Sequence, residues 1–203
     1  MARILLDGYH RYKIAQEHGL DYKTVEVELP DRDTAKEWIL VNQLGRRNLT
    51  EQEASYYRGK LYSAKKQQGK RTDLTLAQNV LKSDTAEELG KQYGVSHMTI
   101  KRDEQFSKAV DKVANEIGEE AKQAILLGKA GIPKERVEQL IEIKHEAPEL
   151  IEPILSGEIT ISKAMREINR ENKISNIIEK AAESRTLDEI GIYSVIYAEA
   201  KTA

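Results

Sequence analysis

The sequence predicts an α+β fold that is predominantly α: a small partial α/β unit, then a helix-turn-helix domain and further helices. Strand-like patterns are confined to the first part of the chain, and helical spacing of apolar residues dominates from Thr50 onward. The 203 residues include 33% charged and 5% aromatic residues, a composition typical of helix-rich proteins with thin cores. We expect four segments: 1–49, a partial α/β unit; 50–110, a helix-turn-helix domain; 111–185, a helical scaffold or oligomerisation region; and 186–203, a tail.

The α/β unit is predicted from two short strands that flank a helix. Residues 3–6 are apolar and end at an Asp-Gly turn, and residues 24–29 (TVEVEL) alternate strictly between polar and apolar. The helix between them runs from about Tyr9 to His18. Because two strands make a poor sheet, we expect this unit to be truncated or to complete its sheet with another chain.

A long helix is predicted to begin after Thr50. The segment Thr50-Glu-Gln-Glu53 has the pattern of a capping box, and the helix is expected to run to about Gln68, where Gly69 ends it. Glycine and proline mark the later breaks in the helical pattern. The further helices are expected at 74–82, 85–93, 96–108, 119–127, 134–145, 148–156 and 161–173.

Residues 85–103 (TAEELGKQYGVSHMTIKRD) have the spacing of a helix-turn-helix. Gly94 supplies the tight turn, where a positive backbone angle favours glycine, and Ser96 caps the second helix. Ile100 points inward, and the outward face carries polar and cationic tips, as a groove-reading helix requires. Asp103 stands where an apolar residue is common in such motifs, which predicts that the helix turns outward early.

The alternative to a DNA-binding motif is an ordinary helical hairpin, which also places glycine between two amphipathic helices. We favour DNA binding because a Lys-Arg pair follows Ile100, and because residues 51–83 carry 7 basic and 3 acidic groups. Phosphates or base edges are expected to contact Ser96, Lys101 and Arg102. The expected readers of base sequence are His97, Met98 and Thr99.

Four blocks of the chain together resemble the ParB/Spo0J-like superfamily of partition and phage DNA-binding proteins. These blocks are ILLDGYHRYKIAQEHG, TVEVEL, WILVNQLGRRNLTEQEAS and the helix-turn-helix, in the family's order, over roughly residues 3–110. The resemblance implies a sulfiredoxin-like fold for the first unit and binding of a nucleotide, CTP with Mg²⁺. The residues that it assigns to the nucleotide or its phosphates are Gly8, Tyr9, His10, Arg11, Asn42, Arg46 and Arg47.

Two residues of this chain argue against the enzyme activities found among the proteins that it resembles. Val41 stands where the family has an acidic residue and offers no oxygen ligand to Mg²⁺, which argues against nucleotide hydrolysis. Tyr9 replaces the reactive cysteine of sulfiredoxin, which rules out that chemistry. The alternatives to a DNA-binding regulator are a nucleotide hydrolase, a ParB-like nuclease, or the DNA-targeting part of a truncated adenine methyltransferase fusion, which residues 190–199 suggest. The alternative to binding a nucleotide or phosphate is that His10 and Arg11 pair with nearby carboxylates such as Asp7.

The expected partners are double-stranded DNA and a second copy of the chain. Ile174, Ile177 and Ile178 form a stripe that is either partner-facing or part of a core. The chain has no cysteine and no run of about 18 apolar residues, so we expect no disulfide, no thiolate chemistry and no membrane partner. We assign no catalytic or metal-binding residue and expect a cytoplasmic, nucleoid-associated protein.

Overall fold

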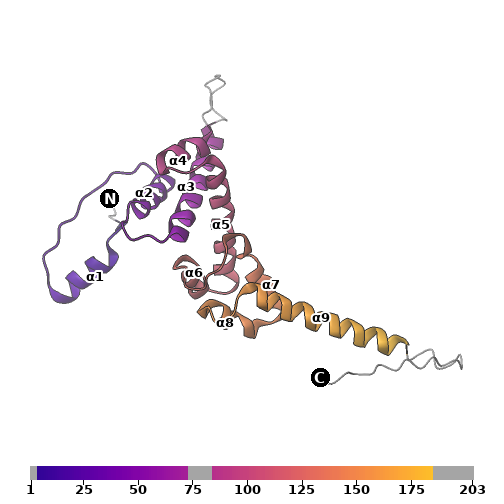
Figure 1. Ribbon diagram of the computed structural model, residues 1–203. Helices are drawn as coiled ribbons and strands as arrows, with labels where there is room; N and C mark the ends of the chain where they lie inside the picture. The colour runs from indigo at the N-terminus through magenta and orange to yellow at the C-terminus, as the bar shows by residue number, and fades with distance from the viewer. Residues whose placement is uncertain (1–3, 73–83, 185–203) are drawn as a thin grey trace, which may run out of the picture. The chain divides into compact units, whose positions relative to one another are not determined.

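The computed structural model describes residues 4–72 and 84–184, and in these ranges the chain is predominantly helical, as predicted (Figure 1). The chain divides into two compact units, residues 1–161 and residues 162–203. The α-helices are α1 (Tyr9–His18), α2 (Arg32–Leu44), α3 (Glu51–Thr72), α4 (Thr85–Tyr93), α5 (His97–Glu116), α6 (Glu119–Leu126), α7 (Gln139–Glu146), α8 (Ile151–Ser156) and α9 (Ile161–Ser184). Two 3₁₀ turns, η1 (Lys134–Arg136) and η2 (Pro148–Leu150), precede α7 and α8.

The predicted α/β unit is the main error of the sequence analysis. Neither residues 4–6 nor residues 24–29 form a strand, and no strand occurs within 4–72 or 84–184. A strand needs a neighbour for its backbone N–H and C=O groups and an apolar face to bury. Here Ile4 and Val25 remain 80% and 89% exposed. The alternating pattern is present, but the pairing partners and the covering layer that would use it are not found in the described part of the chain.

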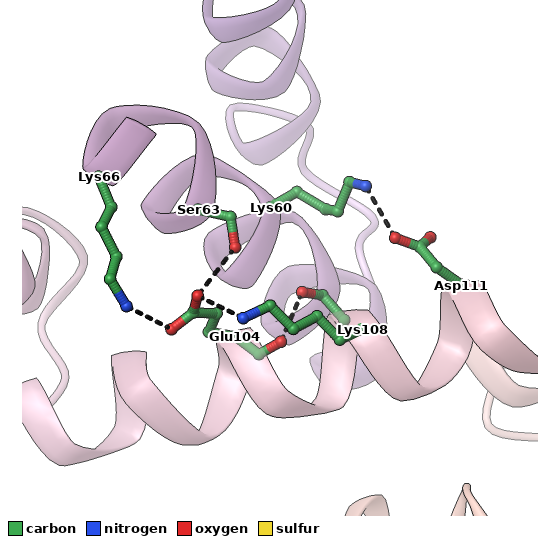
Figure 2. Close-up of a pocket in the computed structure, with 7 residues that line it drawn as sticks. Lys60, Ser63, Lys66, Glu104, Lys108 and Asp111 are labelled. Atoms are coloured by element: carbon green, nitrogen blue, oxygen red, sulfur yellow. Dashed lines mark hydrogen bonds and ion pairs between the residues drawn. The ribbon is translucent and has the colours of Figure 1, made fainter. Parts of the chain in front are cut away.

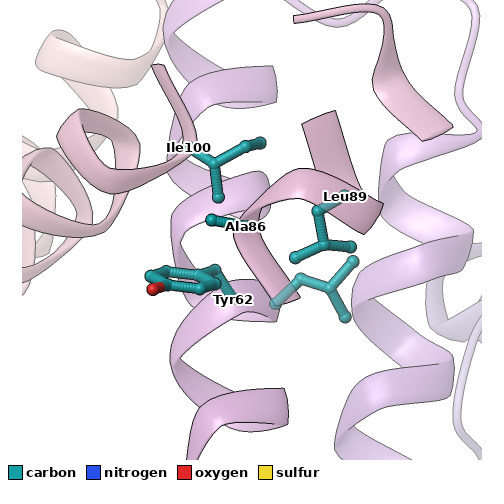
Figure 3. Packing of buried hydrophobic residues seen from close by; sticks show 5 residues of the cluster. Tyr62, Ala86, Leu89 and Ile100 are labelled. Carbon is teal, nitrogen blue, oxygen red and sulfur yellow. The ribbon is translucent and has the colours of Figure 1, made fainter. Parts of the chain in front are cut away.

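A three-helix assembly of α3, α4 and α5 occupies the centre of the first unit, with α2 packed against α3. Its core contains Leu61 and Tyr62 from α3, Ala86 and Leu89 from α4, and Ile100 from α5 (Figure 3). Around this core, half-buried side chains from α2, from the end of α4 and from the turn complete the packing: Leu40, Leu44, Tyr93 and Val95. The apolar positions that the sequence analysis placed inward in the helix-turn-helix, Ala86, Leu89 and Ile100, are therefore buried.

The turn between α4 and α5 has the geometry that its sequence predicts. Gly94 ends α4 with φ 68°, a left-handed conformation in which glycine avoids a steric penalty. Gly90 has a different role in the same turn. A β-carbon at Gly90 would lie 2.7 Å from the carbonyl oxygen of Val95 and 3.3 Å from the backbone nitrogen of His97. The absent side chain therefore lets α4 lie directly against the start of α5.

The beginning of α3 forms the predicted capping box and also joins the next helical layer. The Thr50 N–H donates to Glu53 at 2.8 Å, and the Glu53 N–H donates to the Thr50 hydroxyl oxygen at 3.0 Å. The Thr50 hydroxyl in turn donates to the carbonyl oxygen of Leu126. This contact ties α3 to the end of α6, whose layer with α7 and α8 buries a set of aliphatic side chains: Ala121, Ile125, Leu140, Ile143, Ile151 and Ile154.

Some predicted helix boundaries are wrong. Helix α3 continues through Gly69 to Thr72, since an interior glycine costs a helix only about 1 kcal/mol. Helix α5 runs to Glu116, eight residues beyond the predicted end at 108. The predicted helix 74–82 and the segment 190–199 lie outside the described residues. Within the described ranges, no helix is both long enough and apolar enough to span a bilayer.

Candidate nucleic-acid interface

The start of α5 presents its polar residues to solvent. The Ser96 side chain caps the helix by accepting a hydrogen bond from the Thr99 N–H at 3.1 Å, and the two hydroxyls lie 2.9 Å apart. His97 and Arg102 are exposed, and Met98 is 49% exposed. Because Ile100 on the opposite side is fully buried, this orientation is fixed by the core. Ser96 and Thr99 are occupied by the cap, whereas His97, Met98 and Arg102 face outward.

Lys101 is joined to the start of the preceding helix. Its ammonium lies 3.4 Å from a carboxylate oxygen of Asp84, and both side chains are nearly half exposed. The other carboxylate oxygen of Asp84 caps α4 by accepting from the Ala86 N–H at 3.1 Å. The Ala86 N–H and the Lys101 charge together hold the pKa of Asp84 below its ordinary value. An exposed ion pair of this kind is weak, so Lys101 can exchange Asp84 for a phosphate.

Asp103 does not turn α5 outward, which corrects the prediction made from its sequence position. It is 2% exposed and faces α3, where the Arg58 Nε lies 2.7 Å from one carboxylate oxygen. The Ser55 hydroxyl donates to the other oxygen. The carboxylate is thus satisfied inside the α3–α5 interface, where an apolar residue would have packed. This pairing fixes the register of α5 against α3, so His97, Met98 and Arg102 project from a well-anchored helix.

A pocket of about 350 Å³ lies between α3 and α5, C-terminal to the first turn of α5 (Figure 2). The pocket centres on Glu104, whose carboxylate contacts Lys108 at 2.7 Å and Lys66 at 3.6 Å. The Ser63 hydroxyl donates to the same carboxylate at 3.3 Å. A second pair, Lys60 and Asp111, closes one end at 2.8 Å. Three lysines therefore face two carboxylates here.

We expect acid to weaken the fold partly through Glu104. Burial raises the pKa of this carboxyl, but the hydrogen bond from Lys108 and the charges of Lys108 and Lys66 outweigh it and hold the pKa below its ordinary value. A lowered folded-state pKa adds stability that is present above the unfolded pKa and is lost as the pH falls through the folded pKa. Urea unfolding should therefore show a smaller difference between wild type and Glu104→Gln at about pH 3 than at about pH 7. An equal difference at both values would contradict this.

The N-terminal residues assigned to a nucleotide lie at the start of α1, where Gly8 precedes the helix and Tyr9, His10 and Arg11 belong to its first turn. Gly8 has φ 81°, and its N–H donates to Asp7 at 2.8 Å. The Arg11 guanidinium folds back toward Gly8, since a β-carbon there would lie 3.4 Å from its Nη2. Tyr9 and His10 are exposed and meet edge to face, with ring centroids 6.1 Å apart.

One contact brings the two predicted nucleotide-binding segments together. Arg46, just beyond the end of α2, places its Nη2 3.2 Å from a carboxylate oxygen of Asp7. The Asp7 carboxylate therefore accepts hydrogen bonds from the guanidinium of Arg46, 39 residues away in the sequence, and from the N–H of Gly8. Asn42 is half-buried one turn earlier, and its Nδ2 is buried without a hydrogen-bond partner. Arg47 is exposed.

The residues at this turn do not fit Mg²⁺. A magnesium site needs oxygen ligands in near-octahedral geometry, usually including one or two carboxylates. Asp7 is already engaged by Arg46, and within the described part of the chain no three His, Asp or Glu side chains come together as a metal site. We therefore derive no step that depends on Mg²⁺.

The contacts that hold α3 against α5 were not predicted from the sequence. Gly59, Asp103 and Glu104 lie at the crossing of these helices, and Arg58 pairs with the buried carboxylate. One signal was available: a glycine inside a strong helical pattern is disfavoured relative to alanine and implies a packing reason. The partners 45 and 48 residues apart carried no local signal.

Comparison of the chain with protein-family models, with curated proteins and with solved structures finds no match. The ParB-like resemblance therefore stays a prediction from the motifs quoted above.

Proposed function

We propose that this protein binds duplex DNA by inserting the start of α5 into the major groove, as a regulator of the ParB-like partition or phage type. The observation that carries the proposal is the exposed face of His97, Met98 and Arg102 on a helix whose opposite side is sealed in the α3–α4–α5 core. In a helix-turn-helix, the N-terminal residues of the second helix contact base edges. Arg102 and Lys101 supply the cations that phosphates or guanine edges require.

The kind of DNA contact that we expect from each residue follows from its side-chain chemistry. Arg102 offers a planar fork of donors suited to two acceptors, whereas Lys101 must first leave Asp84 to reach a phosphate. His97 and Met98 lie at the helix start and are placed to contact bases. Ser96 and Thr99 act mainly through the cap, which holds the recognition helix in position.

Arg102→Ala should weaken binding to a random duplex of about 20 base pairs by roughly tenfold at low salt. The wild-type protein should lose affinity steeply as salt rises, because each phosphate contact releases counterions, and Arg102→Ala should flatten that dependence. Fluorescence anisotropy across a salt series measures both effects. Arg32→Ala, the same change at an exposed arginine of α2, is the matched control and should leave binding unchanged. Binding that is insensitive to salt would favour the alternative of an ordinary helical hairpin, which makes no phosphate contacts.

A nucleotide at the Gly8 turn is a second proposal, favoured by the Asp7–Arg46 contact. That ion pair brings Arg46, just beyond the end of α2, close to the start of α1, which carries His10 and Arg11. Helix N-terminal N–H groups with adjacent cations favour a triphosphate such as that of CTP. Isothermal titration with CTP in the absence of Mg²⁺ should show stoichiometric binding that Arg11→Ala removes. Equal binding by both proteins would contradict this assignment.

Self-association is a third proposal and concerns α9. Ile174, Ile177 and Ile178 are 47%, 67% and 63% exposed, at the helical spacing of one apolar stripe. A homodimer that pairs these stripes would remove apolar surface from water. Light scattering should report a dimer for the wild type and a monomer for Ile178→Lys. A wild-type monomer at high micromolar concentration would exclude this surface as a dimer interface.

A further inference from the structure

We propose that the pocket between α3 and α5 binds a second stretch of the same duplex, by gripping a backbone phosphate with Lys60, Lys66 and Lys108. This inference rests on the proposed function, because it adds a phosphate contact to the groove contact of α5. Nothing in the resemblance or in the predicted site residues assigns these lysines a role.

The pocket continues the DNA-facing side of α5. Residues three or four apart lie on one face of a helix, so His97, Lys101, Glu104 and Lys108 follow one another along α5. Seven residues separate Lys101 from Lys108, which is about 10 Å along the helix axis. A helix whose first turns enter the groove carries its next turns past the phosphates that border that groove. The pocket therefore lies where the sugar-phosphate backbone is expected.

The lysines of the pocket are able to change partners. Lys60, Lys66 and Lys108 have side chains that are 39%, 48% and 60% exposed, although each contacts a carboxylate. The pair of Lys60 and Asp111, with both side chains at least a third exposed, contributes at most about 1 kcal/mol, so a phosphate competes with it readily. Lys66 and Lys108 share the largely buried carboxylate of Glu104, so one of them can turn to a phosphate while the other still compensates that charge. Lysine ammonium groups bind phosphate as point charges without a fixed geometry, which suits the regular DNA backbone.

Glu104 is the carboxylate at the centre of the pocket. It is almost buried, with its side chain 12% exposed, and it holds two lysines at once (Figure 2). Its carboxylate keeps the ammonium groups of Lys66 and Lys108 at one place on the surface while DNA is absent. When a phosphate approaches, the same carboxylate repels it. We infer that Glu104 both positions the lysines and limits the affinity of the pocket for DNA.

The test compares salt dependence among variants that keep the recognition helix intact. The double variant Lys66→Gln/Lys108→Gln should reduce the slope of log affinity against log salt by up to about 0.9, because the contact with one phosphate is lost. Lys36→Gln is the matched control, since Lys36 is an exposed lysine paired with Asp33 on α2, and it should leave the slope unchanged. Circular dichroism and thermal melting confirm that each variant is folded.

Glu104→Gln provides a result that a merely structural role would not produce. Removing the negative charge while keeping the shape should tighten DNA binding by about threefold at low salt. Tightening in this variant together with the reduced slope of the double variant supports the phosphate site. An unchanged slope in the double variant, or weaker binding by Glu104→Gln, overturns it.

The two proposals fail in different ways. If Arg102→Ala weakens binding while the double lysine variant matches Lys36→Gln, the groove contact stands and the pocket inference is wrong. If the wild-type protein does not bind duplex DNA at low salt, both proposals are wrong.

Discussion

Gly59→Ala should destabilise the protein by at least about 3 kcal/mol, although alanine is the better helix former by about 1 kcal/mol. Gly59 is buried in the middle of α3, where α5 crosses it. A β-carbon there would overlap the carbonyl oxygen of Asp103 and lie 2.5 Å from its carbonyl carbon and 2.9 Å from the Glu104 nitrogen. These atoms belong to the backbone of α5 and cannot rotate away, so the two helices must separate.

Chemical unfolding of Gly59→Ala measures this loss, and Gly45→Ala is its matched control. Gly45 ends α2 with φ −77°, which alanine adopts freely, and an added β-carbon would find its nearest atoms at 3.6 and 3.7 Å. The control should therefore change stability by less than about 1 kcal/mol. A Gly59→Ala protein as stable as Gly45→Ala would contradict the close approach of α3 and α5.

Arg58→Met should cost about 3–5 kcal/mol of unfolding free energy, because it leaves the buried Asp103 carboxylate without its counter-charge. The Ser55 hydroxyl remains as a donor, but a hydroxyl does not neutralise a buried charge. Replacing both members, in Arg58→Met/Asp103→Leu, should recover much of the loss, since a buried pair is costly mainly when it is broken.

An exposed ion pair of similar length gives the comparison for Arg58→Met. Lys112 and Glu138 lie 2.8 Å apart with side chains 62% and 59% exposed. Lys112→Met should cost no more than about 1 kcal/mol. Urea unfolding of all three variants is the measurement. Equal losses for Arg58→Met and Lys112→Met would show that the Asp103 carboxylate is not buried in solution.

Local chemistry explains which parts of the fold were predictable. The bounds of α4, Thr85 and Tyr93, were predicted from its apolar spacing and from Gly94. The caps formed by Thr50 with Glu53 and by Ser96 were also predicted, because a cap joins residues that are close in sequence. These signals are local, so each can be recognised from a short segment without knowledge of the rest of the chain.

Contacts between distant segments explain the errors. The residues 24–29 alternate as a strand does, but a strand forms only with a partner, and the sequence of one segment does not specify a partner. Asp103 looked like a surface residue because its partners, Arg58 and Ser55, lie on another helix. The candidate DNA face was predictable from α5 alone, whereas the lysine pocket required the position of α3.

The central claim is that the start of α5 contacts duplex DNA, and an NMR titration of ¹⁵N-labelled protein with a short duplex tests it most directly. The account predicts that the largest amide shifts fall on residues 96–102, with a second set around Lys66, Glu104 and Lys108. Arg102→Ala should require more DNA to reach the same shifts. Saturating DNA that shifts other surfaces and leaves residues 96–102 unchanged would contradict the account.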